Sequence, residues 1–141
     1  MKFNFLLASP FKYIFKYMSL IFHGEMHHRQ ADINVNLEVL LFKEDDVYIA
    51  YSPALDISAF GKTEEDAKKE FGNNMRSYIT YCMNKKTLFQ DLRAHGWTVK
   101  SRNRIKAPTE EQLIKMNDTY NDIRNNKSYK TLREDIAIPA V

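Results

Sequence analysis

Residues 47–67, Val-Tyr-Ile-Ala-Tyr-Ser-Pro-Ala-Leu-Asp-Ile-Ser-Ala-Phe-Gly-Lys-Thr-Glu-Glu-Asp-Ala, decide the fold. Over residues 47–51, side chains alternate in the period-2 pattern that predicts a half-buried strand. Pro53 has no N–H for a sheet ladder, so we expect this strand to end just before it. Residues 57–60 predict a short second strand. The stretch therefore reads as strand, corner, strand and the start of a helix.

The helix signal begins at Thr63, after a turn that Gly61 is expected to supply. A threonine hydroxyl can accept an unpaired N–H of a first helical turn, and acidic residues there suit the positive end of the helix dipole. The next three residues are Glu64, Glu65 and Asp66. We therefore predict a helix from Thr63 to about Met83.

The predicted helix carries one apolar stripe, whose members lie three or four positions apart and should pack on a sheet. Gly72 interrupts it, and we expect a close approach of helix to sheet to compensate for that glycine. Cys82 continues the stripe, which favours a small core residue over a reactive nucleophile. The stripe consists of Ala67, Phe71, Met75, Tyr78, Ile79 and Cys82.

Residues 33–42 alternate as a further strand, joined by a charged loop at 43–46 to the strand at 47–52. Leu40 and Phe42 make its second face apolar, so we expect another part of the chain to cover them. The strands 33–42, 47–52 and 57–60 predict an antiparallel meander.

A short helix capped by Thr87 should follow, and Gly96 should end it. Residues 97–100 predict a fourth strand with Trp97 and Val99 facing inward. The predicted fold class is α+β: a three-stranded antiparallel meander plus this fourth strand, with a helix across one face.

Pro108 separates residues 31–106 from a helical C-terminal tail, residues 107–141. Thr109 and Gln112 form a capping box at its start. A stripe formed by Leu113, Met116, Tyr120 and Ile123 predicts one helix, and residues 135–141 predict an edge strand in which Pro139 is tolerated. Such a tail should pack on the domain or on a second subunit, which leaves a homo-oligomer open.

Residues 1–30 form an apolar N-terminal extension of a different character, rich in aromatic residues but interrupted by Lys12 and Lys16. Three interpretations compete: a start codon assigned too early, a helix at a membrane surface, and a packed extra element. We expect residues 1–25 to contribute nothing to the fold. A membrane is expected as a partner only if residues 1–24 are retained.

Charge is unevenly distributed along the chain. Residues 43–70 hold eight acidic and four basic side chains, whereas residues 84–106 hold seven basic and one acidic. This asymmetry indicates either two kinds of partner or two ordinary solvated surfaces.

Motifs of catalysis are not apparent, since the sequence has no glycine-rich phosphate loop and no Ser-His-Asp order. We therefore expect a protein that is not an enzyme and uses no cofactor. His23, His27 and His28 lack a convincing further ligand, so we expect no metal site. His95 is interpreted as a helix-end residue rather than a general base. A single cysteine, Cys82, fits a reducing cytoplasm.

Residues 33–100 resemble the HicB family of antitoxins. The family pattern Tyr-x-Ala-x-x-Pro-x-Leu, followed by a short strand and Gly-x-Thr-x-Glu-x-Ala, matches Tyr48, Ala50, Pro53, Leu55, Gly61, Thr63, Glu65 and Ala67. The chain departs from the family at residues 56–58, and it has no recognisable C-terminal DNA-binding module of the kind that many members carry. The resemblance implies a partial ribonuclease H-like fold of the HicB type.

The resemblance also implies a function, which is to bind and inhibit a small RNA-cleaving toxin of the HicA type by occlusion. The expected contact residues are Tyr48, Tyr51, Pro53 and Asp56. The alternative is a solitary nucleic-acid-binding regulator that uses the basic 85–106 segment. Lys85, Lys86, Arg102 and Arg104 would then contact phosphates, weakly, without sequence choice and with strong salt dependence. Trp97 either stacks on a base or, as its strand pattern favours, belongs to the core.

Overall fold

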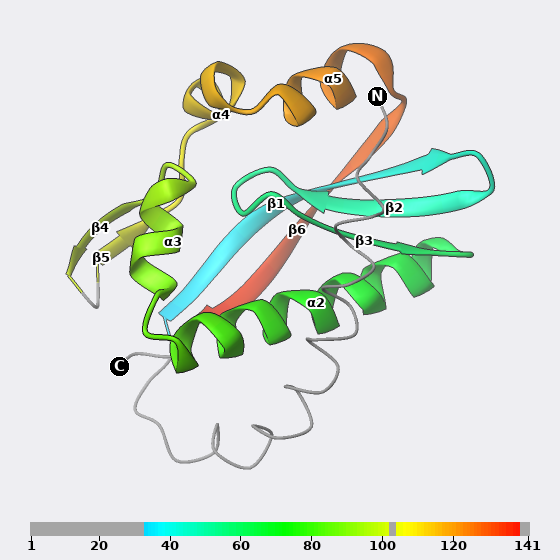
Figure 1. Cartoon of the computed structure of the whole chain (residues 1–141). Helices are drawn as coiled ribbons and strands as arrows, with labels where there is room; N and C mark the ends of the chain where they lie inside the picture. The colour runs from blue at the N-terminus through cyan, green and yellow to red at the C-terminus, as the bar shows by residue number, and fades with distance from the viewer. Residues whose placement is uncertain (1–32, 102–103, 139–141) are drawn as a thin grey trace.

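The computed structural model describes residues 33–101 and 104–138. An antiparallel sheet of four strands forms its centre, in the order β3–β2–β1–β6 (Figure 1). The α+β class and the meander are confirmed. The strands are β1 (Ile33–Glu44), β2 (Val47–Ser52), β3 (Ile57–Gly61) and β6 (Tyr129–Ile138).

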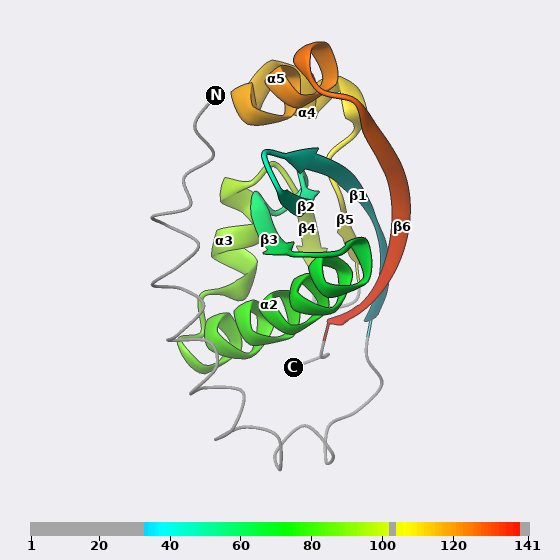
Figure 2. The same cartoon turned by 90° about the vertical axis from the view of Figure 1, so that its right-hand side faces the viewer.

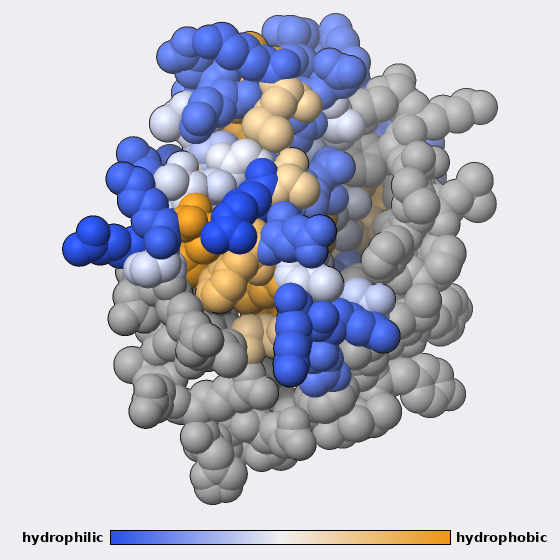
Figure 3. Space-filling model, turned by 60° about the vertical axis from the view of Figure 1, so that its left-hand side comes forward, coloured by the Kyte–Doolittle hydropathy of each residue, from blue (hydrophilic) through white to orange (hydrophobic). Residues whose placement is uncertain are grey.

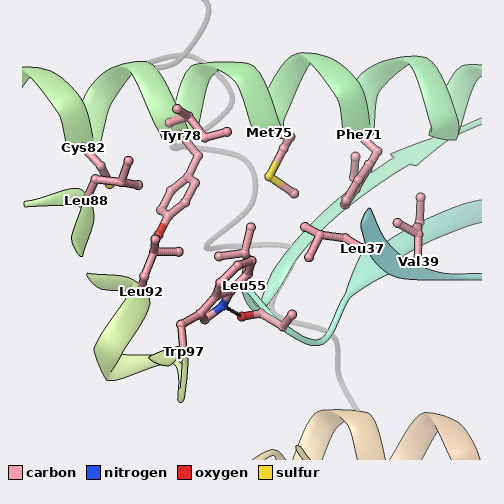
Figure 4. Close-up of a cluster of buried hydrophobic side chains, with 14 of the residues drawn as sticks. Leu37, Val39, Leu55, Phe71, Met75, Tyr78, Cys82, Leu88, Leu92 and Trp97 are labelled. Carbon is pink, nitrogen blue, oxygen red and sulfur yellow. Dashed lines mark hydrogen bonds between the residues drawn. The ribbon is translucent and has the colours of Figure 1, made fainter. Parts of the chain in front are cut away.

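Helix α2 (Glu64–Asn84) lies across one face of this sheet, as predicted. The Thr63 hydroxyl accepts the N–H of Asp66 at 3.1 Å and so caps the first turn. Figure 4 shows Phe71 and Met75 pointing from α2 towards Leu37 of the sheet, and Tyr78 pointing towards Leu92 in the next helix. Every residue of the predicted stripe is buried, so α2 and the sheet form one hydrophobic core.

The fourth strand of the sheet is β6, not the strand that the sequence predicted at 97–100. Residues 98–101 do form a strand, β4 (Thr98–Ser101), but it pairs with β5 (Arg104–Lys106) in a separate two-stranded sheet. β6 instead pairs with β1 in an unbroken register, from Ile33 opposite Ile138 to Phe42 opposite Tyr129. Because β6 matches β1 over ten residue pairs, it completes a ladder that a four-residue strand could not fill.

Helices α4 (Glu110–Met116) and α5 (Asp118–Asn126) cover the opposite face of the sheet. The tail therefore packs on the domain, one of the two predicted outcomes, and it covers Leu40 and Phe42 as expected. The Thr109 capping box is confirmed. The second core consists of Leu40, Phe42, Ile49 and Tyr51 from the sheet and Leu113, Tyr120 and Ile123 from α4 and α5.

Three details of the helices differ from the sequence-based prediction. The tail forms two helices instead of one, because Asn117 ends α4 and caps α5. This break turns Met116 outwards, so that 49% of its surface is exposed. Thr87 precedes α3 (Leu88–Ala94), but its hydroxyl donates to the Cys82 carbonyl at 3.5 Å and caps nothing.

Residues 1–30, with their predicted membrane or leader roles, and Pro139 lie outside the described residues. In the part of the chain that the structure describes, no helix is both long and apolar enough to cross a membrane.

Two glycines have opposite environments. A Cβ on Gly61 would lie 2.5 Å from the Asp66 Cβ and 2.6 Å from the Ala67 nitrogen, so Gly61 permits the first turn of α2 to approach β3. A Cβ on Gly72 would have nothing within 4 Å. The predicted close approach of helix to sheet therefore occurs at Gly61 and not at Gly72.

This contrast predicts opposite effects of the same substitution. Gly72→Ala should raise the free energy of unfolding by about 1 kcal/mol, because glycine lowers stability by that amount in an exposed helix interior. Gly61→Ala should lower it, because the added methyl group meets backbone that cannot move without displacing α2. Urea denaturation followed by the fluorescence of Trp97 measures both. Equal effects of the two substitutions would contradict the assignment.

Candidate functional site

The corner between β2 and β3, residues 52–56, lies in the interior instead of on the surface. Ser52 is fully buried, and Pro53, Ala54 and Leu55 are also buried. Asp56 is exposed and adopts a positive φ of 53°. Short polar side chains tolerate that conformation, so Asp56 lets the chain reverse into β3.

The Tyr51 hydroxyl connects this corner to the tail. It donates to Oδ1 of Asp56 at 2.7 Å and accepts from Nδ2 of Asn117 at 2.8 Å. Burial raises the pKa of Tyr51 well above its usual range, and the negative charge of Asp56 adds to the effect. The Tyr51 hydroxyl therefore stays protonated and serves as a fixed donor.

Asn117 joins three segments through one side chain. Its Nδ2 also donates to the Pro53 carbonyl at 3.2 Å, and its Oδ1 accepts the N–H of Tyr120 at 2.9 Å. The second bond caps α5. The sequence analysis missed Asn117, although an asparagine followed by an aspartate inside a helical stripe is a recognisable N-cap signal.

Trp97 holds the corner from the opposite face. Its Nε1 donates to the Ala54 carbonyl at 2.6 Å, and only 3% of its surface is exposed (Figure 4). The interpretation of Trp97 as a core residue is confirmed. Its buried ring is not exposed for stacking on a base. The corner is thus hydrogen-bonded to α4–α5 on one side and to the α3–β4 connection on the other.

The four residues that were predicted to contact a partner do not form one surface. Tyr51 is 1% exposed and Pro53 is buried, so neither offers a contact area. Tyr48 lies near the other end of β2, half-buried, with Lys43 Nζ 5.5 Å from its ring centroid. The structure joins Tyr51 directly to Asp56 and, through Asn117, to Pro53, and it leaves Tyr48 apart.

Tyr48 belongs instead to an end of the molecule where acidic side chains gather. Tyr48 pairs with Gly61, which brings the tip of the β1–β2 hairpin and the start of α2 to the same end (Figure 1). We call this group the acidic end: Glu44, Asp45, Asp46, Glu64, Glu65 and Asp66. Three of these carboxylates already pair with lysines: Glu44 with Lys127 at 3.1 Å, Glu64 with Lys130 at 2.8 Å and Glu65 with Lys68 at 3.3 Å. Asp45, Asp46 and Asp66 have no such ion pair among the described residues. The hydrogen bond from Lys130 lowers the pKa of Glu64.

Most of the predicted nucleic-acid contacts lie at the other end of α2. Lys85 and Lys86 are exposed there, and Arg104 is exposed on β5; Arg102 lies outside the described residues. Figure 3 views this side of the molecule, where hydrophilic side chains border a smaller hydrophobic patch. We call the exposed cations the basic end: Lys85, Lys86, Lys100, Arg104 and Lys106. At 1.5 Å per residue, the 21 residues of α2 separate the two ends by about 30 Å.

Residues of the types that can act as nucleophile, acid or base meet in a polar cluster between α2 and α3. The Tyr78 hydroxyl donates to the Asp91 carboxylate, and His95 Nδ1 lies 2.8 Å from the Asp91 carbonyl oxygen. Cys82 is buried, and its burial raises the pKa of the thiol, which disfavours the nucleophilic thiolate. This cluster attaches α3 to α2. Within residues 33–101 and 104–138, no three His, Cys, Asp or Glu side chains group as metal ligands.

No family model, no curated protein and no solved structure matches this chain. The resemblance to HicB antitoxins therefore rests on the residues quoted above.

The bonds around Asn117 predict an energetic coupling. Tyr51→Phe and Asn117→Ala should each lower the free energy of unfolding by about 1–3 kcal/mol, because each removes part-buried hydrogen bonds that join β2 and its corner to α5. The double variant should lose less free energy of unfolding than the two single variants together, and the difference should be at least about 0.5 kcal/mol. Urea denaturation of the four proteins measures it.

Tyr129→Phe and Asn125→Ala provide the matched controls, since both residues are exposed. We expect each control to change stability by less than about 0.5 kcal/mol and the pair to be additive. Additive effects of Tyr51→Phe and Asn117→Ala would contradict the role given to Asn117.

Proposed function

We propose that this chain is an antitoxin-like protein that binds and inhibits a small, basic, RNA-cleaving toxin of the HicA type. The observation that carries the proposal is the acidic end, formed within the segment that resembles the HicB family. Asp45, Asp46, Glu65 and Asp66 are all exposed there. Their carboxylates can pair with the cations of a basic protein and steer its approach.

Inhibition would occur by occlusion, with the acidic end and Tyr48 covering the surface that the toxin uses to bind RNA. Exposed carboxylates are suited to this role because they occupy cationic sites that would otherwise contact phosphates. The contact would therefore not need to alter RNA or to involve a cofactor. Tyr48 supplies an aromatic ring beside these charges, a residue type that is enriched at protein interfaces.

A nucleic-acid-binding regulator is the second candidate function, and the basic end favours it. Its five cations are exposed, which suits contacts to phosphates. The burial of Trp97 removes the ring that could have stacked on a base. Binding at this end should therefore be indifferent to sequence and should weaken steeply as salt is added.

Two charge-reversal variants distinguish these functions. Asp46→Lys with Glu65→Lys changes the acidic end, and Lys100→Glu with Arg104→Glu changes the basic end by the same number of charges. The proposal expects an adjacent reading frame that encodes a small basic protein with one functional histidine. That protein, with this histidine replaced by alanine, is the partner to be used. Calorimetry at low salt measures its binding, and fluorescence anisotropy measures the binding of a labelled random DNA duplex.

The acidic-end variant should lose at least tenfold in affinity for the toxin, while the basic-end variant should bind it as the unmodified protein does. The basic-end variant should bind DNA more weakly than the unmodified protein, whereas the acidic-end variant should not. Thermal melting verifies that both variants fold. An adjacent gene product that does not bind, or that binds the acidic-end variant equally well, would contradict the antitoxin proposal.

A further inference from the structure

The two edges of the central sheet are treated differently. On the β3 edge, α2 lies alongside the strand, and Nδ2 of Asn74 donates to the Ser58 carbonyl at 3.2 Å. That edge therefore has an intramolecular hydrogen-bond partner, which is one way in which proteins block pairing with another chain.

The β6 edge has no such cover among the residues that the structure describes. β6 is ten residues long, contains neither glycine nor proline, and pairs with β1 along its whole length without a bulge. Figure 2 shows β6 running along the outer side of the molecule. A long, regular edge strand offers a row of backbone donors and acceptors to a further strand.

We propose that β6 pairs antiparallel with β6 of a second copy of this chain. A twofold axis perpendicular to the sheet would pass midway between the two copies of Glu134, so that these residues stand opposite each other. The two four-stranded sheets would then form one continuous sheet of eight strands, with both α2 helices on the same face. This inference is independent of the proposed function.

The sequence of β6 is self-complementary in this register. Arg133 and Asp135 are exposed on the face that lies away from α2, and Arg133 would stand opposite the partner's Asp135. Symmetry makes this pair twice. Opposite charges placed directly across from each other stabilise antiparallel strands. Asp135 already accepts from Nδ2 of Asn36 at 2.8 Å, which orients its carboxylate without neutralising it.

The other face of β6 is complementary in a different way. Leu132 and Ile136 are half-buried and pack against the core below α2. In the proposed register, Leu132 faces the partner's Ile136, so the apolar layer would continue from one subunit into the other. Charged pairs on one face and apolar pairs on the other favour a second copy of the chain as the occupant of this edge.

Neighbouring registers are less favourable. With the axis between two copies of Arg133, or between two copies of Asp135, like charges would also meet on the axis, and both Arg133–Asp135 pairs would be lost. With the axis between two copies of Leu132, only residues 129–135 of each strand would pair, in place of 130–138. The partner's Glu134 would then stand opposite Lys130, which already pairs with Glu64. The proposed register has one unfavourable contact, because Glu134 meets the partner's Glu134 on the axis.

Sedimentation velocity of the full chain over a series of concentrations tests the proposal. We expect a reversible monomer–dimer equilibrium. Arg133→Asp and Asp135→Arg should each weaken the dimer about tenfold or more, because each places like charges opposite one another. The combined swap, Arg133→Asp with Asp135→Arg, should restore it. Glu134→Gln should strengthen it, because the repulsion on the axis is removed.

Lys100→Glu is the matched control, since it changes an exposed charge on β4 and should leave the equilibrium unchanged. Melting temperatures verify that every variant folds. A chain that remains monomeric at all concentrations would overturn the proposal, as would a dimer that the single reversals do not weaken. Failure of the double swap to restore association, or a weaker dimer with Glu134→Gln, would overturn the assigned register.

Discussion

The side chain of Asn117 imposes the constraint on which the rest of the structure depends. One amide group binds the Tyr51 hydroxyl, the Pro53 carbonyl and the N–H of Tyr120, and so joins the sheet, its buried corner and α5. Trp97 completes the arrangement from the other face by donating to the Ala54 carbonyl. A corner that contains proline has few backbone hydrogen bonds of its own, and these side chains satisfy its carbonyl groups instead. Two helical layers on opposite faces of the sheet are thereby attached to the same short segment.

Local signals in the sequence predicted most of the elements and failed where distant segments meet. The Thr63 cap and the stripe from Ala67 to Cys82 depend on neighbouring residues, and each is found as predicted. The alternation over 47–51 correctly predicted a strand but wrongly a half-buried one, because β2 is covered by α2 on one face and by α4 and α5 on the other. The choice of the fourth strand depended on pairing between β1 and a segment about a hundred residues away, which no local pattern reports. Tyr51 and Pro53 were predicted to contact a partner because they lie in the stretch that resembles the HicB family. Both are buried, and Asn117, which binds the Tyr51 hydroxyl and the Pro53 carbonyl, lies 66 positions from Tyr51.

The same architecture places opposite charges at opposite ends of α2. The acidic end arises because the β1–β2 hairpin and the first turn of α2 meet across the β2–β3 pair. The basic end arises where α2 stops and the β4–β5 hairpin turns outwards. The sequence predicted both charge clusters from their positions along the chain, but it could not show that they lie apart in space. Their separation allows two partners of opposite charge to bind without competing for one surface.

Native-state hydrogen exchange tests the central claim, that the corner makes both helical layers one cooperative unit. The amides of Ile79 in α2 and Ile123 in α5 report on the two layers, and both residues are buried. If Asn117 and Trp97 couple the layers through the corner, both amides should exchange only through global unfolding, with the same free energy of opening and the same dependence on urea. A lower free energy of opening for Ile123, reached with little dependence on urea, would show that α4–α5 detaches by itself and would contradict the account.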